Sequence, residues 1–258
     1  MRFCSLGSGS GGNATVVESS SGTTCSRVLV DAGFSLRELD VRLARAGLSA
    51  SDLDAVFVTH EHGDHIGCAL ALSRRQRIPL WMSRGTWRAI RPPASDEPPN
   101  FARDGEAIVV GDLRLLPYTV PHDAAEPLQL RCDDGARTLG ILTDAGASTP
   151  HMLAHLQGCR ALLLECNHDR DMLARSRYPA SLKARISSRL GHLANDAAAE
   201  ILASCLHSGL AHLVAAHLSE QNNRPELVRN CLAKASGWPE DAVLVADPQL
   251  GTPWLRLG

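Results

Sequence analysis

The chain has 258 residues, which suits one large domain or two small ones. Hydrophobic residues make up 44% and charged residues 21%, and the formal net charge is −2, so the composition is typical of a soluble globular protein and excludes a polycationic nucleic-acid binder. No apolar run approaches the roughly 20 residues of a membrane span, and the N-terminal apolar stretch is too short for a secretory signal, so we expect a cytoplasmic protein without membrane association.

The first predicted strand, residues 1–6, leads into a glycine-rich loop. Gly7, Gly9 and Gly12 have the spacing G-x-G-x-x-G, and Asp31 ends a later apolar run, which on spacing alone is a dinucleotide-binding fingerprint. That fingerprint requires a helix directly after the glycines, whereas the residues that follow are β-branched and end in a Ser/Gly turn. We therefore expect the loop to join two strands and the protein not to bind NAD.

The predicted order is strands first and a mixture of helices and strands later. Apolar or alternating runs predict strands at residues 13–20, 23–33, 54–59, 78–83, 112–123, 128–135, 136–146, 159–166, 211–217 and 241–247. Helical spacing and capping residues predict helices at residues 35–48, 66–77, 149–156, 169–175, 195–207 and 224–236. Residues 95–112 are rich in proline and charge and predict a connection. We expect one domain over residues 1–258, an α/β fold of four layers with helices outside and two sheets inside.

The eight cysteines are scattered along the chain and form no C-x-x-C pair. In a chain of this length, such a pattern is typical of small buried hydrophobic residues in a reducing compartment. We therefore expect free thiols and no disulfide framework.

The densest group of metal-binding residue types follows the strand predicted at residues 54–59. In the run Thr-His-Glu-His-Gly-Asp-His, residues 59–65, His60 and His62 alternate and so face one side of an extended segment. Asp64 and His65 lie beyond a flexible glycine and can point to a second position nearby. Imidazole and carboxylate ligands suit zinc, manganese or iron. The alternative is a polar surface loop rich in histidine, but its place directly after a buried strand favours a site.

This run resembles the H-x-H-x-D-H signature of the metallo-β-lactamase superfamily, whose fold is an αββα sandwich. The other motifs of the superfamily resemble positions that follow in order along the chain. The resemblance implies that Asp31 is an acid that supports the metal loop and that His122 is a ligand of the first metal. It also implies that Asp144 bridges two metals and that His217 is a ligand of the second.

Further segments resemble one branch of the superfamily, the YycJ/WalJ-like proteins, which are similar to ribonuclease Z and the β-CASP nucleases. These segments are GSGSGGN, PHDA, ECNHD, YPASLKARI, GHLAND and HLSEQNN. The resemblance implies a 5′-to-3′ DNA exonuclease in which Glu165 and His192 match a carboxylate and a second histidine beside the metals. Ala194 departs from the pattern, which has serine there, and this change weakens a helix cap or a phosphate contact without removing a ligand.

The expected chemistry requires two divalent metal ions, zinc or manganese or else iron. Ions about 3.5–4 Å apart and bridged by Asp144 lower the pKa of a shared water, so that hydroxide exists near neutral pH. Asp64 would bind the second ion and hold that water in line. His192, kept protonated by Glu165, is the candidate general acid for the leaving oxygen. The alternatives are that His192 caps or packs a helix end and that Glu165 pairs with an arginine.

Several features favour a nucleic-acid substrate, contacted through its phosphate backbone. A run without acids follows the metal loop and contains Arg74, Arg75, Arg77, Arg84, Arg88 and Arg91. A smaller basic group, Lys183, Arg185 and Arg189, lies near His192 in the sequence. The alternative for the larger group is a solvated helix face. Aromatic residues make up only 4%, which argues against an extended base-stacking surface, and only Phe34, Tyr118 and Tyr178 lie near predicted site loops.

The glycine loop is a second candidate for substrate contact. In the resembled fold it lies on the rim that holds the metals, and the side chains of Ser8, Ser10 and Asn13 can donate hydrogen bonds to a phosphate. The alternative is a tight turn between strands.

Two other functions remain open, a thioester hydrolase similar to glyoxalase II and a non-catalytic metal-binding protein. The first has the same metal signature, but we find no segment that would recognise glutathione, and the second is disfavoured by the complete set of ligands. The native metal and the oligomeric state are not indicated by the sequence.

Overall fold

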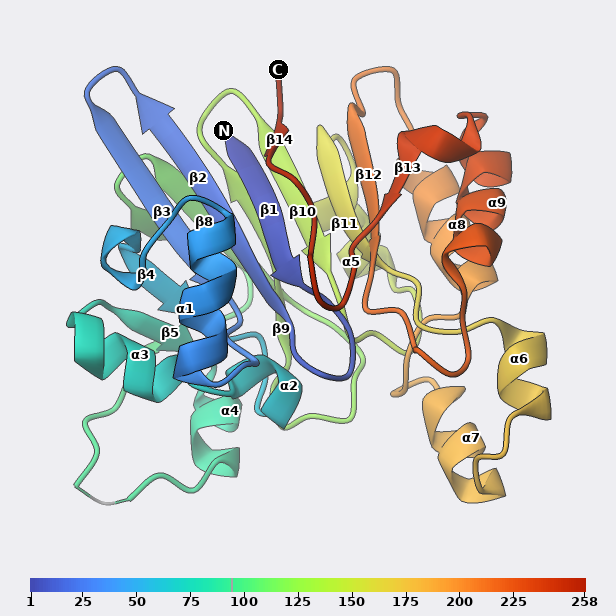
Figure 1. Cartoon of the computed structure of the whole chain (residues 1–258), viewed down its shortest axis with the longest axis horizontal. Helices are drawn as coiled ribbons and strands as arrows, with labels where there is room; N and C mark the ends of the chain where they lie inside the picture. Colours follow the sequence, from blue (N-terminus) through green and yellow to red (C-terminus); the bar gives the residue numbers. More distant parts are fainter. Residues whose placement is uncertain (94) are drawn as a thin grey trace.

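The computed structural model describes residues 1–93 and 95–258 and contains two β-sheets stacked between layers of helices (Figure 1). The first sheet has the order β14 (Leu255–Arg256), β1 (Arg2–Gly7), β2 (Ala14–Ser21), β3 (Thr24–Val30), β4 (Ala55–Phe57), β5 (Leu80–Met82) and β6 (Asn100–Phe101). The second has the order β13 (Val243–Val245), β12 (His212–Ala216), β11 (Ala161–Glu165), β10 (Thr138–Leu142), β9 (Leu128–Asp133), β8 (Leu113–Thr119) and β7 (Ile108–Val110). This architecture confirms the expected four-layer αββα sandwich.

Helices cover the outer face of each sheet (Figure 1). The longer ones are α1 (Leu36–Arg45) and α3 (Ala69–Gln76) over the first sheet, and α5 (Pro150–Leu156), α8 (Asn195–Cys205) and α9 (Pro225–Ser236) over the second. The short ones are α2 (Gly63–Ile66), α4 (Arg84–Ala89), α6 (Arg170–Arg175) and α7 (Ala180–Ile186), with single 3₁₀ turns η1 (Ala50–Asp52) and η2 (Glu240–Ala242). Across the described ranges, no helix has the length and apolar character to cross a membrane.

Three clusters of buried apolar residues fill the three interfaces between the four layers. Phe3 and Leu115 belong to the cluster between the two sheets. Leu39 of α1 packs on the outer face of the first sheet, and Ile201 of α8 and Val228 of α9 pack on that of the second. The apolar residues whose spacing predicted these helices therefore form the face that each helix buries.

Both sheets change from antiparallel to parallel pairing along their order. In the first sheet, β1, β2 and β3 pair antiparallel, and β3, β4, β5 and β6 pair parallel. In the second sheet, β7 to β10 pair antiparallel and β10 to β13 pair parallel. Because parallel strands end at the same edge of a sheet, the residues that follow them come together there.

The elements that the sequence analysis did not predict include α4, α7, β6, β7 and β14. Two of them, β6 and β7, lie in residues 95–112, which we expected to be a connection leading into strands. The helices have six and seven residues, which is too short for a hydrophobic period to be visible, and α7 has no buried residue. The strands have two or three residues and depend on neighbouring sheet edges that local sequence does not specify.

All eight cysteines are free thiols, as expected. Six are buried and behave as small hydrophobic residues, but Cys25 is exposed and Cys231 is half-buried.

Candidate metal centre

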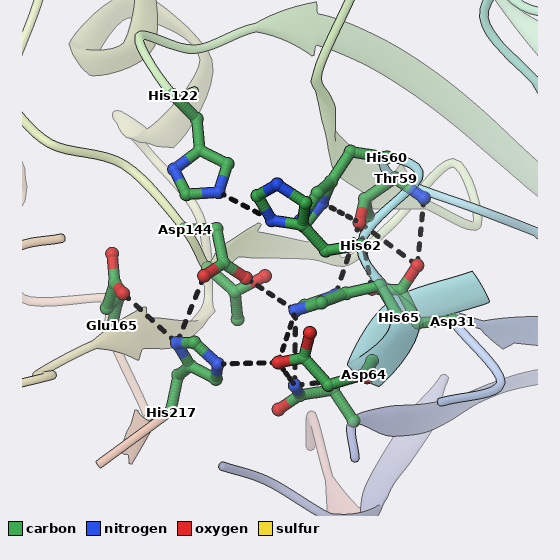
Figure 2. A network of polar contacts seen from close by, with 12 residues as sticks. Asp31, Thr59, His60, His62, Asp64, His65, His122, Asp144, Glu165 and His217 are labelled. Atoms are coloured by element: carbon green, nitrogen blue, oxygen red, sulfur yellow. Dashed lines mark hydrogen bonds and ion pairs between the residues drawn. The ribbon is translucent and has the colours of Figure 1, made fainter. Parts of the chain in front are cut away.

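The residues predicted to bind metal meet at one edge of the sandwich, where the parallel strands of both sheets end (Figure 2). Residues 60–65 follow β4 of the first sheet, and the remaining residues follow strands of the second. Asp31, Asp144 and His217 have φ values of 62°, 51° and 55°, and each lies within two residues of a strand end. This left-handed conformation is rare outside glycine, and such strain is typical of functional sites.

Three imidazole nitrogens form the first group of possible metal ligands. The Nε2 atom of His60 lies 3.0 Å from Nδ1 of His62, and that Nδ1 atom lies 3.2 Å from Nε2 of His122. Nitrogens that bind one zinc ion tetrahedrally at typical distances lie about 3.3 Å from one another. The three nitrogens therefore have the spacing of ligands to a common ion.

Carboxylate and imidazole atoms form a second group next to the first. The Nε2 atom of His65 lies 2.6 Å from Oδ2 of Asp144 and 3.6 Å from Oδ2 of Asp64. That Asp64 oxygen lies 3.4 Å from Nε2 of His217. Oδ2 of Asp144 is buried, and its 2.6 Å contact with His65 lacks the geometry of a hydrogen bond. Carboxylate and imidazole atoms gathered in this way suit a divalent metal.

Hydrogen bonds at the outer nitrogens fix two rings of the first group, those of His60 and His122. His60 Nδ1 lies 3.0 Å from the hydroxyl of Thr59, and His122 Nδ1 lies 3.0 Å from the carbonyl of Gly191. When Nδ1 carries the proton, Nε2 is left as the nitrogen that can bind a metal.

The rings of the second group are fixed by buried carboxylates. Asp31 lies 2.8 Å from Nδ1 of His65 and also accepts a hydrogen bond from the backbone N–H of Thr59 at 2.8 Å. Glu165 lies 3.2 Å from Nδ1 of His217. Asp31 thus lies behind the metal loop, at the position in which an acid would support it.

The protonation states of His60 and Asp144 suit metal binding. Burial, with a smaller contribution from His65, lowers the pKa of His60 well below its ordinary value, so this imidazole is neutral. Burial raises the pKa of Asp144, but His217 and His65 outweigh this effect and hold that pKa well below its ordinary value. An ionised carboxylate and a neutral imidazole are the forms that bind a cation. Burial lowers the pKa of His65 and of His217, but Asp144 outweighs it and raises both pKa values, so these two residues must release a proton to bind a metal.

Glu165 and His192 form a pair beside Asp144. His192 Nδ1 lies 2.8 Å from Oε1 of Glu165 and 3.1 Å from Oδ1 of Asp144. Burial lowers the pKa of His192, but the two carboxylates outweigh it and hold this pKa well above its ordinary value. The pair is therefore a histidine that holds a proton next to the metal groups.

A cleft of about 410 Å³ opens over this arrangement. Asp64, Asp144, His192 and His217 are part of its lining, so a ligand in the cleft has access to both the metal groups and the His192 ring. Its volume is at the lower end of the range for small-molecule sites.

Residues 26–217 match a family described as "Beta-lactamase superfamily domain". The chain belongs to the metallo-β-lactamase superfamily. Over 232 residues it is 35% identical to a Bacillus anthracis protein named "Exodeoxyribonuclease YycJ", which covers 89% of this chain and 86% of that protein. Over 243 residues it is 32% identical to "Exodeoxyribonuclease WalJ" of Streptococcus pneumoniae, covering 91% of this chain and 89% of that protein.

A solved structure supports the same fold. The metallo-β-lactamase fold protein YhfI from Bacillus subtilis superposes with a TM-score of 0.73 at 17% identity, over 97% of this chain and 98% of that chain. These comparisons confirm the superfamily predicted from residues 60–65, the branch that contains YycJ and WalJ, and a metal-dependent hydrolase.

The glycine loop joins β1 to β2 as expected. Most of its polar groups contact the segments that carry Asp64 and His217, and few of them face the cleft. Ser8 and Asn13 are buried. The Oγ atom of Ser8 accepts a hydrogen bond from the backbone N–H of His217 at 2.8 Å and donates to Asn13 at 3.1 Å. The backbone N–H of Asn13 donates to the carbonyl of Asp64 at 2.8 Å. Of the three expected phosphate contacts, only Ser10 is exposed and lines the cleft, so Ser8 and Asn13 are support residues instead.

The six arginines after the metal loop are less available for phosphate binding than the sequence indicates. Arg74 and Arg75 form ion pairs with Asp96 and Asp40, and the Arg84 guanidinium lies 4.3 Å from the Phe101 ring centroid. None of the six belongs to the described residues that line the cleft.

The sequence analysis missed a network of asparagines behind the site. Asn167 donates a hydrogen bond to the carbonyl of His217 at 3.0 Å, and Asn223 donates to that of Cys166 at 2.7 Å. The amides of Asn195 and Asn223 exchange two hydrogen bonds, at 2.9 and 2.8 Å. These contacts tie together the segments that hold Glu165, the loop before α8 and His217. These asparagines lie in the segments ECNHD, GHLAND and HLSEQNN, which served above only to identify the YycJ/WalJ-like branch.

Proposed function

We propose that the chain is a two-metal phosphodiesterase that shortens DNA from its 5′ end, folded as a single domain over residues 1–258. The proposed ligands are His60, His62 and His122 for one ion and Asp64, His65 and His217 for the other, with Asp144 shared between them. Asp31 holds the metal loop through its contact with His65. The metals are zinc or manganese, or else iron, because the ligand set is imidazole and carboxylate.

The reaction requires both the metals and a proton donor. Two divalent ions supply an activated water near neutral pH and neutralise charge on the phosphoryl oxygens. Asp64 lies at the cleft floor, where its carboxylate can orient the attacking water. A phosphodiester also needs a proton for the leaving sugar oxygen, and His192 can donate it from Nε2 because its Nδ1 is held by Glu165.

The observation that carries this proposal is the Glu165–His192 pair next to Asp144, with His192 and Asp144 lining the cleft. A thioester has a thiolate leaving group that departs without a proton donor, whereas an alkoxide leaving group benefits from one. The relatives named as exodeoxyribonucleases support DNA as the substrate. The 5′ end is proposed on the family resemblance alone.

The test is hydrolysis of a panel of substrates by the purified chain loaded with Mn²⁺ or Zn²⁺. The panel contains 5′-labelled single- and double-stranded DNA, the matching RNA, bis-p-nitrophenyl phosphate and a glutathione thioester. We expect labelled mononucleotides to be released from DNA at early times. Turnover of the thioester alone, or of nothing while two metals are bound, would falsify the proposal. Faster cleavage of RNA than of DNA would show that RNA is the substrate. Label retained on long products would show that shortening does not start at the 5′ end.

A further inference from the structure

One wall of the cleft is formed by α7 and the residue before its cap. Leu182, Arg185 and Ile186 have the spacing that puts side chains on one face of a helix, and all three line the cleft together with Tyr178. Pro179 caps the helix and Tyr178 precedes it. Since α7 has no buried residue, the core does not explain why apolar and aromatic side chains point to this side.

The guanidinium of Arg185 is bound at its Nε atom, whereas its two terminal amino groups are exposed. Its Nε atom donates to Oδ2 of Asp123 at 2.5 Å, and its side chain is 61% exposed. Within the described part of the chain, its two terminal amino groups have no hydrogen-bond partner. Asp123 is fixed in turn because its backbone N–H donates to the carbonyl of Leu190 at 2.9 Å. An arginine anchored in this way presents a planar pair of donors that matches phosphate oxygens.

Tyr178 is the one residue of the three aromatic candidates that reaches the cleft. Tyr118 is buried and donates its hydroxyl hydrogen to the carbonyl of Ile141 at 2.6 Å. Phe34 is buried beneath the guanidinium of Arg42, 4.0 Å from its ring centroid. Tyr178 is half-buried, and within the described residues its ring makes no cation–π contact such as that between Phe34 and Arg42.

We propose that α7 and Tyr178 form a subsite for one nucleotide of the substrate, in which Arg185 binds a phosphate and Tyr178 stacks on the base. Leu182 and Ile186 supply the apolar surface beside the ring. The subsite recognises any base because every base has a face for stacking. This inference rests on the proposed function, since it places the bound nucleotide beside the metal groups at the cleft floor.

The test is titration of the metal-loaded full chain by calorimetry with dAMP and with deoxyribose 5-phosphate, neither of which contains a diester. Base stacking on an aromatic side chain should make dAMP bind about 5- to 150-fold more tightly than the sugar phosphate. Tyr178→Leu keeps the apolar volume and should remove this difference, whereas Tyr178→Phe should keep it. Equal binding of the two ligands by the wild type, or a difference that persists in Tyr178→Leu, overturns the stacking role.

Arg185 is tested on the same ligands with a matched control. Arg185→Gln should weaken both ligands by at least tenfold, whereas Lys183→Gln removes the same charge from the same helix at a residue that does not line the cleft. Lys183 Nζ instead donates to the carbonyl of Ala174 at 2.6 Å. Equal affinities in the two variants overturn the phosphate role. Unfolding midpoints and metal content should match the wild type in all four variants.

The outcome separates this inference from the proposed function. If the wild type binds dAMP with the expected pattern but does not cleave DNA, the phosphodiesterase proposal is wrong and the subsite stands. If the wild type cleaves DNA and Tyr178→Leu has an unchanged KM for DNA, the subsite is wrong and the proposed function stands.

Discussion

The buried carboxylate of Glu165 lies 2.8 Å from Nδ1 of His192, which leaves Nε2 as the ring nitrogen that can carry a second proton. The same oxygen lies 3.2 Å from Nδ1 of His217. One acid on the last residue of β11 therefore orients both the proposed proton donor and a proposed metal ligand. This arrangement links the position of the donor to that of the metal groups.

Replacing His192 by alanine should affect substrates according to their leaving group. DNA hydrolysis should slow by about 10²–10⁴-fold, because a sugar alkoxide needs a proton. Hydrolysis of bis-p-nitrophenyl phosphate should slow much less, because nitrophenolate leaves without one. The measurements are the kcat values for both substrates and the metal content of the variant. Equal slowing of both substrates, or loss of a metal, would show that His192 supports the site and does not donate the proton.

The two ligand groups should bind metal separately. Protein stripped with a chelator and dialysed against Zn²⁺ should take up two ions per chain, and His122→Ala and His217→Ala should each take up about one. Metal binding should raise the unfolding midpoint of the wild type, because the ions bind the folded state. The control is His207→Ala, which should retain two ions, since the ring of His207 contacts the carbonyl of Cys159 and the N–H of Gly209, both outside the site. A variant at His217 that retains both ions would remove this residue from the ligand set.

Two serines of the glycine loop should behave differently although they are two positions apart. Ser8→Ala leaves the buried N–H of His217 without its acceptor and should lower the free energy of unfolding by roughly 1–3 kcal/mol. Ser10→Ala should change it by less than about 0.5 kcal/mol, because Ser10 is exposed. Chemical denaturation measures both. If Ser10 contacts phosphate, its variant should raise KM for DNA but not for the small diester.

The parts of the site that the sequence predicts are those with a local signal. Residues 60–65 concentrate four predicted ligands in one loop, and Asp144 and His217 each lie at the end of an apolar run that predicts a strand. That these residues meet was implied by the family resemblance, because they follow strands of two different sheets. The role of each residue came from the family resemblance and not from the pattern.

The parts that the sequence did not predict depend on contacts between distant segments. Ser8 was expected at the substrate, but a hydroxyl that accepts from an N–H 209 positions away has no local signature. The Asn195–Asn223 pair joins two loops that are apart in the chain. The short helix α7 buries no residue, so it lacks the apolar period by which longer helices such as α1 were found.

Acid should destabilise the protein in part through Glu18. Burial raises the pKa of this carboxyl, but hydrogen bonds from Arg2 and Arg27 outweigh it, so the pKa is lowered from its ordinary value. A lowered folded-state pKa means that the stabilisation is present above the unfolded-state pKa and is lost as the pH falls through the folded-state value. Glu18→Gln should therefore be less stable than the wild type at pH 7 and nearly equal to it well below pH 4. Unfolding curves between pH 7 and pH 3 measure the difference, and a gap that stays constant with pH would contradict the assignment.

Ala194→Ser should stabilise the chain. Ala194 is the N-cap of α8 and provides no side-chain hydrogen bond, although the first turn of a helix has free N–H groups. The N–H of Ala197 already donates to Asp196 Oδ1, so a serine hydroxyl would accept from the N–H of Asp196 and should raise the free energy of unfolding by about 0.5–2 kcal/mol. The matched control is Ala199→Ser, which places the same side chain inside α8 and should cost a few tenths of a kcal/mol. Because Ala194 is buried, KM for DNA should not change. A lower KM without added stability would show that this position contacts phosphate and does not cap the helix.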